Sequence, residues 1–281
     1  MSPGPRDLAD FARVLCQQRN CSLIRELGAG AHKRAYLIEK DGAQFALKIA
    51  PITASLKPRF EREAAALTGC AHPAVAQLHE AYAVTSGNEE FWVSIEEYLP
   101  GGTLAERFAV GRVGHSLIRS IGLSLADALD HLRDRNLVHR DIKPANILFR
   151  TSDAVVLTDF GIVRMLDAPS LTQDFLPQGP GTPLYASAEQ LLNEKELIDW
   201  RTDQFCLATV LAQGILGWHP FAPENDPMLA IARVAKRQPL PAKSRNGLIE
   251  SEFSALVKAL ASWPAQRHRF PKDFKAALSG K

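Results

Sequence analysis

The residues best suited to chemistry lie within one short segment, residues 139–148, which reads His-Arg-Asp-Ile-Lys-Pro-Ala-Asn-Ile-Leu. Asp141 and Asn146 stand five positions apart and supply oxygen ligands or a general base, and Lys143 places a cation between them. A short apolar run follows and ends at Asp159, which delivers a second carboxylate to the same place. This part of the chain therefore brings carboxylate, amide and ammonium groups together.

Phosphoryl transfer uses this set of parts. Mg²⁺ prefers one or two carboxylates together with an amide oxygen and substrate phosphates, which Asp159 and Asn146 could supply. A separate carboxylate, such as Asp141, must take the proton of the attacking hydroxyl or orient that hydroxyl. A lysine such as Lys143 can offset the charge that grows on the transferred group.

A second set of candidates lies in the first 70 residues. Gly28 and Gly30 stand between two β-like runs, where glycine lets the backbone bring its N–H groups near a phosphate, although a plain hairpin turn explains the same pattern. Lys48 lies in an alternating apolar run and faces away from its apolar neighbours, on a face that can line a cleft. Glu63, on the following helix, could pair with Lys48, and Glu61 is a competing candidate for the same pairing.

Hydrophobic periodicity predicts the elements that position these residues. Up to about residue 100 the chain is rich in strand patterns, with a hairpin signal at Asp41-Gly42, and beyond Pro100-Gly101-Gly102 it is mostly helical. This order predicts a segregated α+β fold of two parts. The predicted elements are a leading helix at 8–15, strands at 23–27, 35–38, 44–49, 91–95 and 155–157, and helices at 59–67, 117–132, 203–216, 249–262 and 274–278.

Composition bounds the class of protein. Of 281 residues, 46% are hydrophobic and 23% charged, which is ordinary for a globular chain and excludes a disordered chain, a coiled coil and a disulfide-stapled miniprotein. The formal charge is +2, so there is no global electrostatic reason to expect nucleic acid or an anionic membrane as a partner.

The cysteines and the chain's polar start indicate a soluble cytoplasmic protein or a soluble piece of a larger one. Cys16, Cys21, Cys70 and Cys206 are too scattered for a zinc site, so we expect reduced thiols in a reducing compartment. No run approaches the roughly 20 apolar residues of a membrane helix, and the first ten residues do not resemble a signal peptide.

With these motifs the sequence resembles the eukaryotic-like Ser/Thr protein kinase family, from about residue 27 to about residue 267. The resemblance implies a two-lobed kinase-like fold and an enzyme that transfers the γ-phosphoryl group of MgATP to Ser/Thr hydroxyls of protein substrates, with autophosphorylation. The compact motifs look more like those of a bacterial member. The implied parts are an N-terminal extension with its leading helix at 1–22, a β-rich N-lobe at 23–99 and an α-rich C-lobe at 100–281, with a single kinase domain over 23–281.

The family's functional residues carry over where the motifs match. Asp141 matches the catalytic base, Lys143 the lysine typical of Ser/Thr-specific members, and Lys48 the lysine that holds the α- and β-phosphates, with Glu63 as its ion-pair partner. Asn146 matches one of two magnesium ligands, and Asp159 matches the other. The implied nucleotide-binding residues are Leu27, Gly28, Gly30, Ala35, Lys48, Glu97, Leu99, Asn146 and Asp159, among which Glu97 and Leu99 match the hinge that meets adenine.

The resemblance also implies supports for the site. Asp203 matches a buried aspartate that braces the catalytic loop, and Glu189 should pair with Arg267. Gly181-Thr182-Pro183 matches the end of the activation loop, with Thr182 near the substrate hydroxyl. The irregular segment 167–181 lies in that loop, as its length and prolines also suggest.

Regulation through the activation loop is a hypothesis. Ser170 and Thr172 lie within it, and Arg140 could bind a phosphate there through two hydrogen bonds. Solvated loop hydroxyls are the alternative interpretation of the same residues.

Four positions depart from the family pattern. Lys33 replaces the third loop glycine, Ala35 replaces the valine over adenine, Ala188 replaces a proline, and Glu96 stands at the usually apolar gatekeeper position, where a carboxylate needs a partner. A pseudokinase or ATP-binding scaffold is therefore the alternative, although all the catalytic groups are present. A small-molecule kinase is a third reading, disfavoured by Lys143 and by the Gly-Thr-Pro segment.

Overall fold

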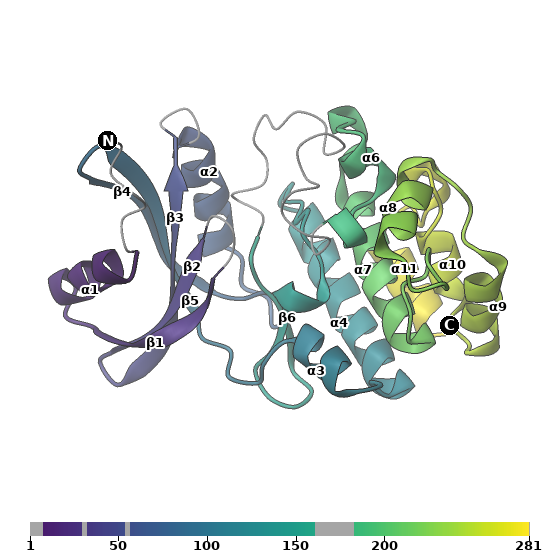
Figure 1. Ribbon diagram of the computed structural model, residues 1–281, viewed down its shortest axis with the longest axis horizontal. Helices are drawn as coiled ribbons and strands as arrows, with labels where there is room; N and C mark the ends of the chain where they lie inside the picture. Colours follow the sequence, from purple (N-terminus) through teal and green to yellow (C-terminus); the bar gives the residue numbers. More distant parts are fainter. Residues whose placement is uncertain (1–7, 30–32, 54–56, 161–182, 281) are drawn as a thin grey trace. The chain divides into compact units, whose positions relative to one another are not determined.

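The computed structural model of the protein describes residues 8–29, 33–53, 57–160 and 183–280. The chain divides into two compact units, residues 1–71 with 76–99 and residues 72–75 with 100–281, and each is described by itself. The first unit is built on an antiparallel sheet and the second on helices, as Figure 1 shows. Residues 72–75, which fall inside the predicted N-lobe, belong to the helical unit.

The sheet of the first unit has the strand order β1-β2-β3-β5-β4, and all its neighbours are antiparallel. Asp41 and Gly42 form the turn between β2 and β3 with φ angles of 51° and 77°, the left-handed conformation that such a two-residue hairpin requires. The predicted hairpin is thus confirmed. The strands are β1 (Ser22–Ala29), β2 (Arg34–Lys40), β3 (Ala43–Ile52), β4 (Leu78–Ser86) and β5 (Glu89–Glu97).

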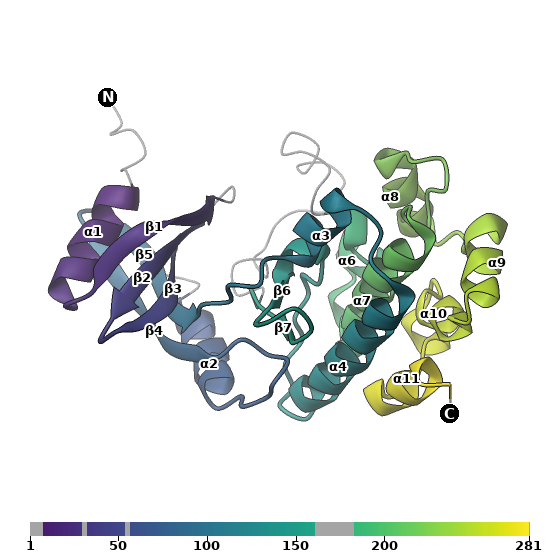
Figure 2. The same cartoon turned by 90° about the horizontal axis from the view of Figure 1, so that it is seen from below.

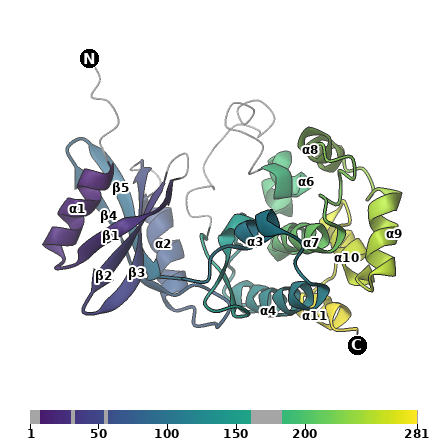
Figure 3. The same cartoon turned by 60° about the horizontal axis from the view of Figure 1, so that its bottom comes forward.

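Two helices cover opposite faces of this sheet (Figure 3). Helix α1 (Leu8–Gln18) buries its apolar side against Leu47, Ile49 and Val93. Helix α2 (Lys57–Thr68) packs on the other face, where Phe60 meets Trp92 edge-on with ring centroids 5.2 Å apart. Since successive strand residues point to opposite faces, the Lys48 side of β3 faces away from α1.

The helical unit is organised around α7, of which every residue from Thr202 to Leu216 except Gln213 is buried, as its nearly continuous apolar sequence predicts. Helices α4, α7 and α11 pack side by side (Figure 2). Gly214 lets α7 and α4 approach closely, because a Cβ there would lie 2.4 Å from Ile118 Cδ1. The α-helices are α3 (Leu104–Val110), α4 (His115–Arg133), α6 (Ala188–Leu191), α7 (Trp200–Leu216), α8 (Pro227–Ala235), α9 (Ala242–Glu250), α10 (Ser254–Ala259) and α11 (Pro271–Leu278).

A small hairpin and four 3₁₀ turns complete the described part of this unit. The hairpin pairs β6 (Ile147–Phe149) with β7 (Val155–Leu157). The 3₁₀ turns are η1 (Pro144–Asn146), η3 (Pro183–Tyr185), η4 (Lys195–Leu197) and η5 (Pro264–Gln266). Among the helices in the described ranges, none is long and apolar enough to cross a membrane.

The sequence prediction was wrong in one helix and incomplete elsewhere. The helix expected at 249–262 is two helices, α9 and α10, separated at Glu252, whose φ of 63° is incompatible with a continuing α-helix. Strands β4 and β6 and helices α3, α6 and α8 were not predicted.

Candidate active site

The loop between α4 and β6 carries Asp141, and a buried carboxylate holds its backbone. Asp203, on α7, accepts hydrogen bonds from the backbone N–H groups of His139 and Arg140, each at 2.7 Å. Arg140 has a left-handed φ of 65°, which a non-glycine residue adopts only where its surroundings enforce it. The prediction that Asp203 braces this loop is confirmed.

Asp141 is the centre of a compact polar cluster. Lys143 Nζ donates to Asp141 Oδ2 at 2.8 Å, and Asn146 Nδ2 donates to the backbone oxygen and to Oδ2 of Asp141 at 2.8 and 2.9 Å. Lysine and amide together fix the carboxylate in one orientation. They also leave the amide oxygen of Asn146 as the atom that this side chain can offer to a cation.

The hairpin β6–β7 brings the backbone at Asp159 next to the backbone of Asn146. Residues 147 and 157 pair across the hairpin, and Thr158 N donates to Asn146 O at 3.0 Å, so Asn146 and Asp159 emerge at its open end. Asp159 has a φ of 63°, another left-handed non-glycine position. The prediction that this strand delivers a second carboxylate beside Asn146 agrees with this pairing.

His139 ties the loop to the strand end. Burial lowers the pKa of His139 to about 4, so the imidazole is neutral at physiological pH. Its Nδ1 accepts the backbone N–H of Asp141 at 3.3 Å, which leaves the proton on Nε2 to be donated to Thr158 O at 3.0 Å. Phe160 packs on the same ring, with centroids 4.7 Å apart.

The donors around Asp141 fit magnesium better than zinc. Asp159 and Asn146 offer oxygen atoms alone, and Mg²⁺ is typically held by one or two such groups plus substrate phosphates. In the described part of the chain no group of three or more His, Cys, Asp or Glu residues could hold a metal by itself. A cation here would therefore rely on substrate oxygens to complete its shell.

The sheet unit gathers a second set of predicted residues in one row. The strand registers pair Gly28 with Ala35, Ala35 with Lys48, and Lys48 with Ser94, so the four share one face of the sheet. Lys48 thus lies two strands from the predicted glycine-rich turn. Gly30 lies outside the described residues.

Glu96, for which the sequence identifies no partner, forms an ion pair with Lys48. Lys48 Nζ lies 2.5 Å from Glu96 Oε2, and Ser94 Oγ donates to Glu96 Oε1 at 2.9 Å. The side chain of Glu63, with which Lys48 is expected to pair, lies outside the described part of α2. Glu61, the competing candidate, is exposed.

The predicted hinge follows at the end of β5. Glu97 N donates to Gln77 O at 2.9 Å, and its side chain accepts the N–H of Gln77 at 3.3 Å, which fixes the strand end to the segment before β4. Leu27 is half-buried on β1, and Leu99 is 5% exposed.

The predicted ion pair between Glu189 and Arg267 is confirmed. Both side chains are fully buried, and both carboxylate oxygens accept from the guanidinium, at 2.6 and 3.1 Å. Burial raises the pKa of Glu189, but the hydrogen bonds and charge of Arg267 outweigh it, so the pKa lies below its usual value. Thr182, Ser170 and Thr172 lie outside the described residues.

The family model of the protein kinase domain matches residues 21–271. The chain belongs to the protein kinase family. The kinase resemblance and the fold class inferred from the sequence are therefore confirmed, and the described structure has the family's strand-rich and helical units.

Two curated relatives of this kinase chain come from mycobacteria. It is 31% identical over 272 residues to the serine/threonine-protein kinase PknF of Mycobacterium tuberculosis, covering 92% of this chain and 55% of the relative. It is 30% identical over 222 residues to the serine/threonine-protein kinase PknB of Mycolicibacterium smegmatis, covering 78% of this chain and 35% of the relative. The kinase chain thus spans about half the length of PknF and about a third of the length of PknB.

Two residues of the kinase site were missed from the sequence. Ser94 anchors Glu96, and Gln190 donates to the backbone oxygen of Arg140 at 2.7 Å, which adds a second clamp on the loop before Asp141. Ser94 could have been found from the alternation of β5, since it shares a face with Glu96. Nothing in the sequence marks Gln190.

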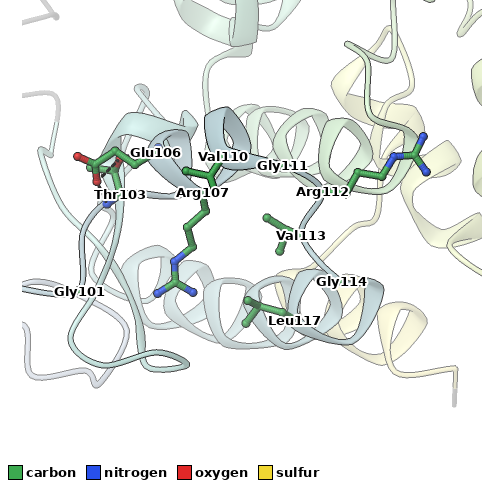
Figure 4. Close-up of a pocket in the computed structure, with 10 residues that line it drawn as sticks. All are labelled: Gly101, Thr103, Glu106, Arg107, Val110, Gly111, Arg112, Val113, Gly114 and Leu117. Carbon is green, nitrogen blue, oxygen red and sulfur yellow. Dashed lines mark hydrogen bonds between the residues drawn. The ribbon is translucent and has the colours of Figure 1, made fainter.

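A pocket in the helical unit of the kinase lies apart from these residues (Figure 4). It is lined by α3 and the start of α4, with Val110, Val113 and Leu117 among its walls. Its Arg107 already donates to Ser152 O at 2.7 Å and stacks on the Phe149 ring. The pocket contains none of the predicted catalytic or nucleotide-binding residues.

Proposed function

We propose that the chain is a Ser/Thr protein kinase that transfers the γ-phosphoryl group of MgATP to Ser/Thr hydroxyls of protein substrates, including its own. The observation that carries this proposal is the Asp141 cluster. A single carboxylate is oriented by Lys143 and Asn146 on a loop whose backbone Asp203 clamps. This is the positioning that phosphoryl transfer demands, since the reaction depends far more on orientation and electrostatics than on covalent chemistry.

Asp141 is the proposed base. Its carboxylate accepts the proton of the substrate hydroxyl as that oxygen attacks the γ-phosphorus and the bond to the departing ADP oxygen breaks. Lys143, 2.8 Å from Asp141, stabilises negative charge on the transferred group. The hydroxyl proton ends on Asp141, and the γ-phosphoryl group ends on the substrate oxygen.

The remaining predicted residues have proposed roles in holding MgATP. Lys48 binds the α- and β-phosphates with Glu63 as its partner, and Asn146 and Asp159 hold magnesium. When bound there, the metal would neutralise phosphate charge and orient the phosphoryl group. The adenine and the rest of the nucleotide are assigned to Leu27, Gly28, Gly30, Ala35, Glu97 and Leu99.

The experiment that tests this function compares Asp141→Ala with the unaltered chain. Each is incubated with radiolabelled MgATP and a generic basic protein, and label on that protein is measured. We expect Asp141→Ala to lose at least about 10²-fold in rate, as for removal of a general base. The matched control is Asp153→Ala, an exposed carboxylate of the same unit in the β6–β7 turn, which should transfer at the unaltered rate. Equal rates in Asp141→Ala and the unaltered chain would leave the pseudokinase alternative.

The proposal includes autophosphorylation on the activation loop and action in the cytoplasm. Ser170 and Thr172 are the proposed acceptors, and mass spectrometry after incubation with MgATP should find phosphate between residues 159 and 189. Absence of phosphate in that interval would overturn this part. The free thiols of Cys16, Cys21, Cys70 and Cys206 support a reducing compartment.

A further inference from the structure

The ion pair of Lys48 and Glu96 lies on the face of the sheet that carries the predicted nucleotide residues. Nζ and Oε2 are 2.5 Å apart, and the two side chains are 12% and 15% exposed. The register places Lys48 opposite Ser94, and Glu96 two residues further along β5 on the same face. A charged pair this shielded from water is stronger than an ordinary surface pair.

Glu96 is held in place from its other oxygen. Ser94 Oγ donates to Glu96 Oε1 at 2.9 Å, and Ser94 is only 5% exposed. One carboxylate oxygen is thus anchored to the strand while the other meets the ammonium of Lys48. The anchor reduces the freedom of Glu96 to swing away from Lys48.

We propose that Glu96 competes with the phosphates of the nucleotide for Lys48 and so lowers the affinity of this chain for adenine nucleotides. This inference rests on the proposed function of Lys48 as a phosphate-binding residue. It assigns to the carboxylate at the gatekeeper position a role in setting the affinity for nucleotide phosphates.

Two physical effects explain why Glu96 should lower the affinity for phosphates. An ammonium that donates to a carboxylate must share or exchange that bond when a phosphate oxygen approaches, and lysine, as a compact point charge on a flexible stem, can do either. The carboxylate also places a negative charge within about 6 Å of any phosphate that Lys48 contacts, and like charges in a partly shielded site repel. Both effects lower the affinity for a ligand that carries phosphates, and neither acts on a ligand without them.

The competition is tested by calorimetry with three magnesium-containing ligand solutions: a nonhydrolysable ATP analogue, ADP and adenosine. The test variant is Glu96→Gln, which keeps the size of the side chain and an oxygen for Ser94 but removes the charge. We expect this variant to bind the ATP analogue and ADP about five- to tenfold more tightly than the unaltered chain, as for loss of one competing charge-assisted bond. Adenosine affinity should change less than about twofold, because adenosine has no phosphate for Lys48 to bind.

The matched control is Glu80→Gln, which removes the same charge from the next strand of the same sheet. Glu80 pairs with Arg19, so this variant should leave all three affinities unchanged. Ser94→Ala is a second variant that frees Glu96 without removing it, and it should shift ATP-analogue affinity in the same direction by a smaller factor. Circular dichroism on each variant establishes that the fold is retained.

Three results would overturn the inference. Equal tightening for adenosine and the ATP analogue would show that Glu96 acts on the base, and weaker binding of the analogue by Glu96→Gln would show that Glu96 assists Lys48. Unchanged affinities in both Glu96→Gln and Ser94→Ala would remove the competition. Failure of the proposed function is distinguishable, because it would appear as phosphoryl transfer that does not depend on Asp141.

Discussion

Two ion pairs, one in each unit of the molecule, use the same chemistry for different ends. In the helical unit Arg267 binds both oxygens of Glu189 with no exposure of either side chain, and it also donates to the carbonyls of Ala261 and Arg201 at 2.9 Å each. In the sheet unit Lys48 meets one oxygen of Glu96, and both side chains retain some contact with water.

Burial and the geometry of the donor group decide whether an ion pair stabilises the fold or can exchange its bond for one to a ligand. A guanidinium has a planar fork that can satisfy a carboxylate and two carbonyls at once, so Arg267 ties together segments that are far apart in the sequence. An ammonium on a flexible stem makes a bond that a better acceptor can replace. We therefore assign stability to the first pair and ligand competition to the second.

The largest expected effect comes from breaking the buried pair. Arg267→Met should destabilise the protein by about 3 to 5 kcal/mol, because it leaves the charge of Glu189 buried without a counter-charge, with only the Thr202 hydroxyl still donating to it. The free energy of unfolding from urea denaturation measures this loss. A double variant, Arg267→Met with Glu189→Leu, is the control and should recover part of the stability, since no charge is then left buried. A loss below about 1 kcal/mol for the single variant would contradict the structural role.

The second effect comes from removing the exchangeable cation. Lys48→Met should lower the rate of phosphoryl transfer about 10²- to 10³-fold, as for loss of one electrostatic contact to a charged transition state. Its free energy of unfolding should fall by only about 1 to 2 kcal/mol, because Glu96 keeps its bond from Ser94 and some access to water. Initial-rate kinetics and urea denaturation on the same preparation separate the two readouts. A stability loss equal to that of Arg267→Met would erase the distinction between the pairs.

The contacts of the helical unit could largely be predicted from the sequence. Glu189, Arg267 and Asp203 occupy positions that the kinase motifs assign, and the apolar run around Asp203 predicts the buried helix that carries it. Each of these motifs has a fixed backbone geometry. The positions of its residues in the sequence therefore predict where they lie in the structure.

The sheet side was less predictable for physical reasons. The pairing of Lys48 with Glu96 depends on the register of β3 against β5. These two strands are neighbours in the sheet, but along the chain α2 and β4 lie between them. A slip of one residue in that register would move Glu96 to the other face, so spacing alone cannot identify its partner. The helix break at Glu252 was missed for a related reason, because a left-handed glutamate leaves no compositional signal.

Asp203 is a buried carboxylate whose described hydrogen bonds come from backbone N–H groups and not from a cation. Burial raises the pKa of Asp203 to about 7, although the N–H groups of His139 and Arg140 oppose the rise. A raised folded-state pKa stabilises the fold below the ordinary value near 4 and loses that contribution as pH rises toward 7. The free energy of unfolding of the unaltered chain, minus that of Asp203→Asn, should therefore fall between pH 4 and 7 by at most about 1.4 kcal/mol per pH unit.

The pH series needs the Asp203→Asn reference because His139 acts in the opposite sense. Burial lowers the pKa of His139 to about 4, so its contribution is lost as pH falls from about 6.5, and both proteins contain it. Urea denaturation at half-unit pH intervals gives the difference curve. A difference that stays constant with pH would mean that the two N–H groups keep Asp203 ionised as fully as in the unfolded chain.

The smallest effect is expected at an exposed pair of the sheet unit. Arg19 donates to Glu80 at 2.5 Å, but the side chains are 30% and 45% exposed, and Arg19 also stacks on the Tyr82 ring. Glu80→Gln should change the free energy of unfolding by less than about 1 kcal/mol, because water replaces what an exposed ion pair provides. Raising the salt concentration should shrink even this difference, whereas the effect of Arg267→Met should persist, since salt screens exposed charges far more than buried ones. A loss above about 2 kcal/mol at Glu80 would show that exposure does not decide how much an ion pair of this protein contributes to stability.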